Sequence, residues 1–402
     1  MVVPNKTTFH RQKKGRTTML SPLRPLLEAT QTYGYAQGAF NVNAVAQAKA
    51  VIAVHEMFRS PAILQGADLA NAFMGGRTDF ANGTVADKQK GALNIGNAVK
   101  KYGTDSPIPV VLHLDHGKDM DSVKAAIAGG YTSVMIDGSS LPYKDNVELT
   151  REVVKYAHER GVTVEGELGV LAGVEDHVFS ATSTYTNPLD AVDFIKKTKV
   201  DCLAISYGTM HGAAKGKNVK LRREIVIAVK ECLLHEGIFA ALVSHGSSTV
   251  PQYIVNEINA LGGKLTNTNG ISLSELKAAI PCGIGKINVD TDIRLAVTRN
   301  MKELFANRPQ LRTSPSIGGV YSLLEQHPEQ FDPRAFLPPI MDTVMYGTVP
   351  DADVAAICDC IEKGVHEVVG TLIVEFGSVG KAPLIERVTL DEMAERYRKA
   401  GI

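Results

Sequence analysis

The chain has 402 residues, with 43 basic and 43 acidic side chains and a formal net charge of zero. This balance argues against a nucleic-acid partner, which usually requires a basic surface. No apolar run approaches the roughly 18 residues of a membrane span, and the amino terminus lacks an apolar signal core. We therefore expect a cytoplasmic protein with no membrane partner. Five irregularly spaced cysteines indicate reduced thiols rather than a disulfide framework.

Residues 1–18 form a basic amino-terminal arm. The first acidic residue of the chain is Glu28. The basic side chains before it are Lys6, Arg11, Lys13, Lys14, Arg16 and Arg24. Organellar targeting peptides share this bias, and an organelle is then the alternative location. A disordered arm, or an arm used in assembly, explains the composition equally well.

Strand-like apolar runs alternate with helical patterns over residues 19–305, which we expect to form one catalytic domain. The runs lie near residues 38–43, 61–66, 109–116, 133–138, 163–169, 202–208, 239–246 and 283–290. Such alternation implies βαβ units and a parallel sheet. Eight units predict an α/β fold, a closed (β/α)8 TIM barrel. An open, doubly wound sheet is the alternative, but no G-x-G-x-x-G turn follows the first strand.

The segments between and after these strands complete the prediction. Amphipathic stretches at 44–58, 119–128, 145–159, 220–235 and 250–260 predict helices. Two long connections, 67–90 and 169–187, interrupt the rhythm, and long loops at a barrel's carboxyl rim usually serve as lids or binding loops. Beyond residue 305, proline-containing segments link short helices. We predict that residues 306–402 form a helical extension packed on the barrel or on a partner subunit.

Polar side chains gather at or near the carboxyl ends of the predicted strands, where parallel barrels build their active sites. The residues are His116, Asp137, Glu167, His211, His245, Asn288 and Asp290. Three histidines from three strands, with one open position, are typical of a catalytic zinc site. A lone histidine is more often structural, but three, each followed by glycine, favour a metal centre. Asp115, directly before His116, suits a general acid or base.

Asp137 and Glu167 add two carboxylates beside the predicted zinc site. They are able to bind a second cation, or to hold a histidine ligand in one tautomer. The alternative is a pair of buried, hydrogen-bonded structural carboxylates.

Two short polar turns predict a phosphate site. The turns are His245-Gly246-Ser247-Ser248 and Asn288-Val289-Asp290-Thr291, and a helical pattern follows each. Backbone amides at a helix start bind anions, and the last two βα loops of a barrel frequently hold phosphate. We therefore expect a small sugar phosphate as the partner of this site.

Seven motifs carry a resemblance to a known family. They are GAFNVN (38–43), HLDHG (113–117), SVMIDGS (133–139), VEGELG (164–169), YGTMHG (207–212), HGSS (245–248) and KINVDTD (286–292). In this order they resemble the class II fructose-bisphosphate aldolases, from about residue 19 to 300 and more weakly beyond. The resemblance implies a carbon–carbon lyase that reversibly cleaves fructose 1,6-bisphosphate to dihydroxyacetone phosphate and glyceraldehyde 3-phosphate.

The resemblance also implies a role for particular residues. His116, His211 and His245 match the zinc ligands, Asp137 and Glu167 match a second metal position, and Asp115 and Glu175 match the catalytic acid/base pair. In synthesis zinc would polarise the ketone, Glu175 would remove the adjacent proton, and Asp115 would protonate the new hydroxyl. The implied substrate contacts are Asn41, Ala67, Gly212, Gly246, Ser247, Ser248, Asn288, Val289, Asp290 and Thr291. The implied cofactors are Zn²⁺, a second divalent cation and a monovalent cation, in a homodimer or homotetramer.

Two departures from the family concern the aldehyde half of the site. Ala67 stands where the family usually has a serine near the phosphate, and no arginine near 375–381 matches the one that some members lend across a subunit interface. Lys381 or Arg334 is the candidate substitute. An aldolase for tagatose 1,6-bisphosphate is therefore an alternative. A non-catalytic sugar-phosphate-binding barrel is a second alternative, but it predicts the loss of Asp115 and Glu175, and both are present.

Overall fold

The computed structural model describes residues 20–402, apart from 172, 176–177, 181–183 and 216–218. The basic arm, residues 1–18, lies outside the described residues. Within the described part of the chain, none of the helices is both long enough and apolar enough to cross a bilayer.

Eight parallel strands close into a barrel in the order β1-β10-β9-β8-β5-β4-β3-β2. Their bounds are β1 (Gln37–Asn41), β2 (Ala62–Ala67), β3 (Val110–Gly117), β4 (Ser133–Ile136), β5 (Thr163–Leu168), β8 (Cys202–Ile205), β9 (Ala241–Ser244) and β10 (Ile284–Val289). The predicted TIM barrel is thus confirmed, and the doubly wound alternative is wrong.

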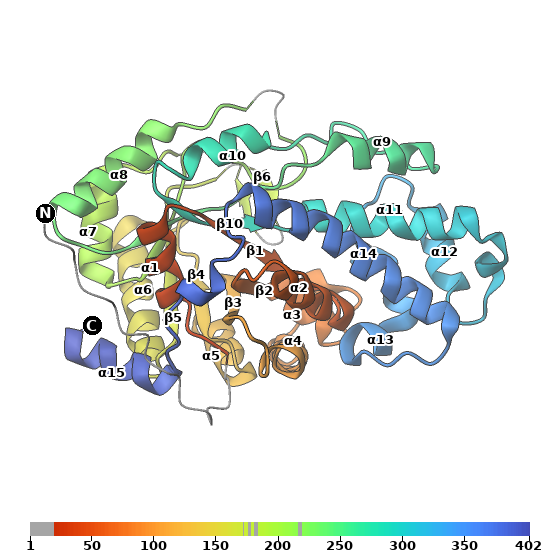
Figure 1. Ribbon diagram of the computed structural model, residues 1–402, viewed down its shortest axis with the longest axis horizontal. Coiled ribbons are helices and arrows are strands. Elements are labelled where there is room, and N and C mark those ends of the chain that lie inside the picture. The colour runs from red at the N-terminus through yellow and green to blue at the C-terminus, as the bar shows by residue number, and fades with distance from the viewer. Residues whose placement is uncertain (1–19, 172, 176–177, 181–183, 216–218) are drawn as a thin grey trace, which may run out of the picture.

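Helices pack around the barrel, and many of their buried apolar residues belong to the same core as its strands (Figure 1). They are α2 (Val45–Met57), α4 (Val85–Gly103), α5 (Met120–Gly129), α6 (Tyr143–His158), α7 (Pro188–Thr198), α8 (Arg223–His235), α9 (Gln252–Ala260), α10 (Leu273–Ala279) and α11 (Thr291–Asn307). Local sequence sets where they begin. Thr84 and Asp87 form a capping box at the start of α4, and the Asn187 side chain caps α7, whose first residue is proline.

The segment 67–90 is not the open connection that the sequence suggested. It contains α3 (Asp68–Met74) and the short helix η1 (Phe80–Asn82), and every residue of α3 is buried. Helix α3 packs extensively on α4, so its apolar residues serve the core. The second long connection, 169–187, holds a small antiparallel pair, β6 (Gly173–Glu175) and β7 (Val178–Ser180).

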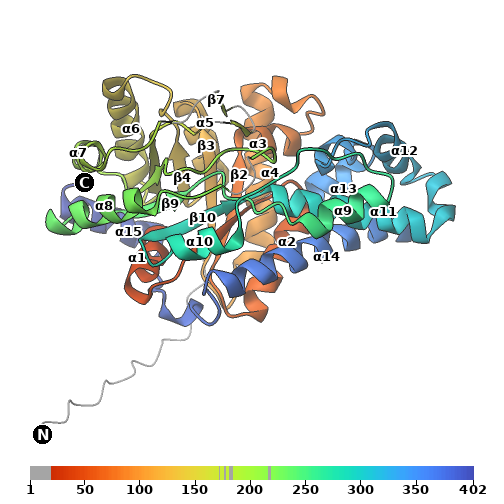
Figure 2. The ribbon, with the colours of Figure 1, turned by 90° about the horizontal axis from the view of Figure 1, so that it is seen from above.

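Helices follow the barrel to the end of the chain: α12 (Gly318–Gln326), α13 (Met341–Tyr346), α14 (Ala352–Glu375) and α15 (Leu390–Ala400). Short 3-10 turns join them, namely η2 (Pro309–Thr313), η3 (Pro333–Ala335), η4 (Pro338–Ile340) and η5 (Ala382–Leu384). Helix α14 packs on α2 and α11, and its buried residues belong to the same hydrophobic core as the barrel. Figures 1 and 2 show α11 to α14 extending to one side, with α15 on the opposite side near α6.

The inside of the barrel changes character from its amino end to its carboxyl end. Helix α1 (Arg24–Tyr33) covers the amino end, and Leu23, Leu26 and Leu27 share one cluster with inward residues such as Ala39 and Val111. Further along the strands the inward positions become polar and are still fully buried: Gln65, His113, Glu165 and Lys286. An inward row of this kind supports a polar site at the carboxyl rim.

Candidate active site and metal centre

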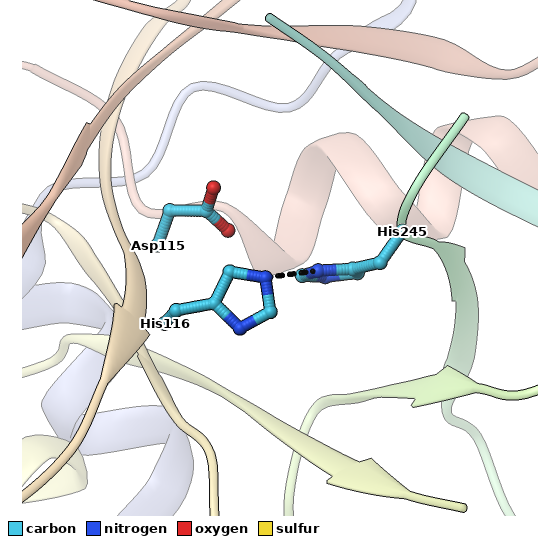
Figure 3. Close-up of side chains that lie close together, drawn as sticks. All are labelled: Asp115, His116 and His245. Carbon is cyan, nitrogen blue, oxygen red and sulfur yellow. Dashed lines mark hydrogen bonds between the residues drawn. The ribbon is translucent and has the colours of Figure 1, made fainter. Parts of the chain in front are cut away.

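The end of β3 bends so that two consecutive side chains reach the same site. His116 has a backbone φ of 45°, and the pairing between β3 and β4 shifts register between Leu114 and Gly117. In a regular strand, neighbouring side chains point to opposite faces. The positive φ and the irregular pairing let Asp115 and His116 lie beside each other, as Figure 3 shows.

The three predicted histidines converge. His116 Nε2 lies 3.0 Å from His245 Nδ1, the contact drawn as a dashed line in Figure 3. The ring of His116 also packs edge-on against those of His245 and His211, with centroids 4.7 Å and 5.2 Å away. All three residues are buried. Asp115, His116 and His245 offer ligand atoms within 4.8 Å of one another, which is the spacing of a metal site.

Gly246 allows the two histidine-bearing loops to meet. Its φ is 59°, and a Cβ built on it would lie 2.5 Å from the carbonyl oxygen of Met210 and 3.1 Å from the amide nitrogen of His211. A side chain at 246 would therefore push apart the loops that carry His245 and His211. The glycine after the histidine thus has a packing reason as well as a conformational one.

Two carboxylates surround the other side of His116. Asp137 Oδ2 lies 3.1 Å from His116 Nδ1, and Glu167 Oε2 lies 4.0 Å from the same nitrogen. Burial alone would lower the pKa of His116, but Asp115, Asp137 and Glu167 raise it well above its ordinary value. Burial and the neighbouring Asp137 raise the pKa of Glu167 well above its usual range. The carboxylates therefore favour positive charge at this place.

These residues fit a bound cation. Glu167 Oε2 is buried and has no hydrogen-bond partner among the described residues, an arrangement that is costly unless a cation or water satisfies it. His116, Asp137 and Glu167 form a second group with metal-ligand spacing. The Asp137 contact also holds the His116 ring with Nε2 toward His245, as carboxylate partners of histidine ligands do. Two nitrogens and several oxygens within reach suit a divalent metal.

Asp115 is held at both carboxylate oxygens. Gln65 Nε2 donates to Oδ2 at 3.1 Å, and Asn288 Nδ2 donates to Oδ1 at 3.0 Å. Gln65 also donates to Asn41 Oδ1, and Asn41 Nδ2 donates to Asp290 Oδ2. The predicted residues Asn41, Asn288 and Asp290 thus belong to one network with Asp115. Such a network fixes where the carboxylate presents its lone pairs.

Sequence reasoning missed two buried charges directly under the site. Glu165 Oε1 lies 2.6 Å from His245 Nε2, and Lys286 Nζ donates to Glu165 Oε2 at 3.0 Å. Burial opposes ionisation of Glu165, but Lys286 and His245 hold its pKa below the usual range. Strand alternation places Glu165 on the same inward face as Glu167, and Lys286 on that of Asn288, so the period of two was an available signal.

The remaining predicted contacts divide into two groups. Gly212, Asp290 and Thr291 line a cavity at the mouth of the barrel, and the Ser248 hydroxyl accepts from the amides of Asp290 and Thr291. In contrast, the Ser247 hydroxyl bonds Ser244. The Val289 side chain belongs to the hydrophobic core. Ala67 pairs in register with Asp115 and is buried.

Glu175, the predicted loop base, lies in β6 opposite Val178, but its side chain lies outside the described part of the structure. The backbone of Gly173, at the start of the same strand, forms a bridge with His211. The β6 strand therefore begins against one of the three histidines.

The mouth cavity, of about 540 Å³, carries two arginines. Arg294 and Arg334 both bond Asp332, and the Arg334 guanidinium lies 4.5 Å from the centre of the Phe80 ring. The Lys381 ammonium lies over Tyr35, next to β1 at the amino end of the barrel, so Lys381 does not reach the mouth of its own barrel. Arg334, the other candidate, does line the mouth.

A closed α/β barrel with imidazoles and carboxylates converging at its carboxyl rim defines the class of metal-dependent barrel enzymes. The family model described as "Fructose-bisphosphate aldolase class-II" matches residues 21–381. The chain belongs to the class II fructose-bisphosphate aldolase family and is a metal-dependent carbon–carbon lyase that acts on sugar phosphates.

Known proteins agree with this assignment along nearly the whole chain. The fructose-bisphosphate aldolase of Giardia intestinalis is 35% identical over 379 residues, covering 94% of this chain and 99% of that protein. That of Treponema pallidum is 39% identical over 321 residues, covering 77% and 87%. The crystal structure of the YdjI aldolase from Escherichia coli K12 covers 90% of this chain and 100% of its own, with a TM-score of 0.61 and 25% identity.

Proposed function

We propose that this enzyme reversibly cleaves fructose 1,6-bisphosphate to dihydroxyacetone phosphate and glyceraldehyde 3-phosphate, with Zn²⁺ held by His116, His211 and His245. The convergence of His116 and His245, with facing nitrogens 3.0 Å apart beside Asp115, is the observation that carries the proposal. Bound zinc would supply a Lewis acid for the substrate ketone, so a lysine Schiff base is not required. Asp137 and Glu167 would orient His116 or bind a second divalent cation.

The chain's own residues would move the protons. Asp115 is fixed by Gln65 and Asn288. In cleavage it would take the proton from the hydroxyl on the carbon that becomes the aldehyde, and in synthesis it would return that proton. Glu175 would exchange the proton on the carbon next to the ketone. Water exclusion follows from burial, since Asp115 is 2% exposed and His245 is 1% exposed.

The two ends of the substrate would occupy different parts of the rim. Backbone groups at Gly212, Gly246, Ser248 and Thr291 would hold the dihydroxyacetone phosphate end, with a monovalent cation as a further component. Arg294 and Arg334 would bind the second phosphate in the mouth cavity, because guanidinium groups match phosphate geometry. They would supply the contact that Ala67, which lacks a hydroxyl, does not.

Assembly and location are part of the same proposal. A homodimer or homotetramer would cover exposed apolar side chains such as Met57 and Leu189, which are 76% and 71% exposed. The five cysteines are all free thiols, as in the reducing cytoplasm.

An Asp115→Asn variant tests the proposed chemistry. General acid or base catalysis is worth about 10²- to 10⁴-fold, so we expect cleavage of fructose 1,6-bisphosphate to fall by at least about 100-fold while zinc remains bound. Coupled detection of dihydroxyacetone phosphate measures the rate, with tagatose 1,6-bisphosphate as the comparison substrate. Retention of more than about a tenth of the activity by the variant would remove Asp115 from the mechanism. If the parent enzyme cleaves tagatose 1,6-bisphosphate faster than fructose 1,6-bisphosphate, the proposed substrate is wrong.

A further inference from the structure

Lys286 is a fully buried lysine inside the barrel, below the metal centre. It lies on β10, and its side chain is 0% exposed. Its Nζ donates to Glu165 Oε2 at 3.0 Å and to Asn288 Oδ1 at 2.7 Å. Burying an ammonium group costs several kcal/mol unless close partners compensate. Glu165 and Asn288 are the partners that compensate this cost.

Glu165 connects Lys286 to His245, one of the proposed metal ligands. One Glu165 oxygen faces Lys286, and the other lies 2.6 Å from His245 Nε2. A carboxylate accepts hydrogen bonds, so this contact places the imidazole proton on Nε2. The opposite nitrogen, Nδ1, then faces His116 Nε2 at 3.0 Å with a lone pair to offer. Lys286 thereby helps to set which nitrogen of His245 faces the metal.

Asn288 connects Lys286 to the carboxylate of Asp115, the proposed acid/base residue. Because Lys286 is only a donor, it binds the oxygen of the Asn288 amide and leaves Nδ2 to face Asp115 Oδ1 at 3.0 Å. If the amide were flipped, its oxygen would face the Asp115 carboxylate and its nitrogen would face the Lys286 ammonium. Both hydrogen bonds would then be lost. The lysine thus also fixes one of the two donors that hold Asp115.

We propose that Lys286 is a positioning residue that joins the metal side of the site to its acid/base side. Through Glu165 it orients His245, and through Asn288 it orients Asp115. This inference rests on the proposed zinc centre. It assigns Lys286 no contact with substrate, because its Nζ donates to Glu165 and Asn288 below the centre.

A double-mutant cycle on zinc affinity tests the proposal without using activity. The variants are Lys286→Met, Glu165→Gln and the pair together, titrated with zinc against a chromophoric chelator in the absence of substrate. Loss of an outer partner of a metal ligand typically costs about 10- to 100-fold in affinity, and we expect this from each single change. The pair should lose less than the product of the single losses, since it leaves no unpaired buried charge.

Lys302→Met is the matched control. Lys302 is another buried lysine, 5% exposed, but it lies on α11 and its Nζ has no hydrogen-bond partner among the described residues. We expect it to leave zinc affinity unchanged. If Lys286→Met does not fold, Glu165→Gln and the pair are compared directly, and adding the second change should restore affinity. The positioning role also predicts that Lys286→Arg, which keeps the charge, binds zinc more tightly than Lys286→Met.

The proposal is overturned if Lys286→Met binds zinc within about threefold of the parent, or if the two losses simply multiply. An adduct on Lys286 after borohydride reduction with dihydroxyacetone phosphate would also overturn it, because the lysine would then be a nucleophile. Failure of the proposed function gives a different result: a parent enzyme that binds zinc and shows the coupling, yet does not cleave fructose 1,6-bisphosphate.

Discussion

His116 lies between a second histidine and two carboxylates. Its Nε2 faces His245, while its Nδ1 faces Asp137 and, further away, Glu167. Ser139 donates to Asp137 through both its amide and its hydroxyl, so this carboxylate is itself fixed. Burial opposes its ionisation, but His116 and Ser139 hold the pKa of Asp137 below the usual range. The carboxylate is thus kept charged beside the histidine that it orients.

An Asp137→Asn variant should weaken metal binding. The amide keeps the size of the side chain but loses the charge that supports His116, so we expect zinc affinity to fall by about 10- to 100-fold. Ser139→Ala, which removes one hydroxyl bond and leaves the carboxylate, should have a smaller effect. Competition with a chelator measures both. Equal affinities in Asp137→Asn and the parent would show that Asp137 does not support the metal centre.

Many of the residues that form the site could be predicted because each ends a strand in a recognisable motif. The structure places Asp115, His116, His245, Asp137 and Glu167 together. Glu165 and Lys286 were not predicted, although they lie on the same inward faces. A buried charge is identified by its partner on another strand, and the distance from residue 165 to 286 in the chain hides that partner.

Helices, strands and loops meet closely at the carboxyl rim, where the site lies, and at the amino end of the barrel. At the carboxyl rim, the loop after β9 touches the loop after β8 through Gly246. At the amino end, Asp201 at the start of β8 joins α1, α6 and α15. It accepts hydrogen bonds from Arg24 at 2.8 Å, His158 at 2.9 Å and Tyr397 at 3.0 Å. The Tyr397 and His158 rings stack with centroids 3.6 Å apart.

Gly246→Ala should separate the histidine loops. The new Cβ would lie 2.5 Å from the Met210 oxygen at a φ of 59°, so we expect both lower stability and weaker zinc binding. Gly262→Ala is the matched control, because its φ is 88° but a Cβ there meets nothing within 4 Å. Left-handed strain alone should cost it about 1–2 kcal/mol. Thermal unfolding measures the loss of stability, and zinc titration measures the loss of zinc affinity. Identical losses in Gly246→Ala and Gly262→Ala would contradict the role of Gly246.

Asp201→Asn should change how stability depends on acid. Burial raises the pKa of Asp201, but His158 and Arg24 outweigh burial and lower it from its ordinary value. A depressed folded-state pKa contributes stability that is present above the unfolded value, near 3.8, and is lost as pH falls through the folded value. The parent should therefore lose more stability than the variant between about pH 5 and pH 3. Parallel unfolding curves across that range would contradict the account.

Element prediction succeeded where the hydrophobic period was clear. All eight barrel strands overlap the apolar runs found in the sequence, because parallel barrel strands are buried on both faces and are therefore rich in apolar residues. Residues 67–90 were predicted only as a long connection, whereas the structure has α3, η1 and the start of α4 there. Gly75 ends α3, and a Cβ on it would lie 2.1 Å from the backbone oxygen of Asp87 on α4. Tertiary packing decided the structure there.

At the scale of the whole molecule, the barrel and the helices after it share one hydrophobic core, and Asp332 and Arg334 of the carboxyl-terminal part meet Arg294 of α11 at the mouth. The carboxyl-terminal part of the chain therefore completes the mouth cavity as well as the core. The sequence offered Arg334 as a candidate for this half of the site, but it did not predict the contacts of Asp332 with Arg294 and Arg334, because the chain after residue 305 returns to the rim only through tertiary packing. The fold thus joins the proposed metal centre to the mouth cavity that we propose binds phosphate.

The most direct test of this account is cleavage of fructose 1,6-bisphosphate by the purified enzyme before chelation, after chelation and after zinc is restored. We predict release of dihydroxyacetone phosphate that chelation abolishes and stoichiometric zinc recovers. Activity that persists in the fully chelated enzyme would contradict the metal-dependent mechanism. A zinc-loaded enzyme that releases no dihydroxyacetone phosphate from this substrate would contradict the proposed reaction.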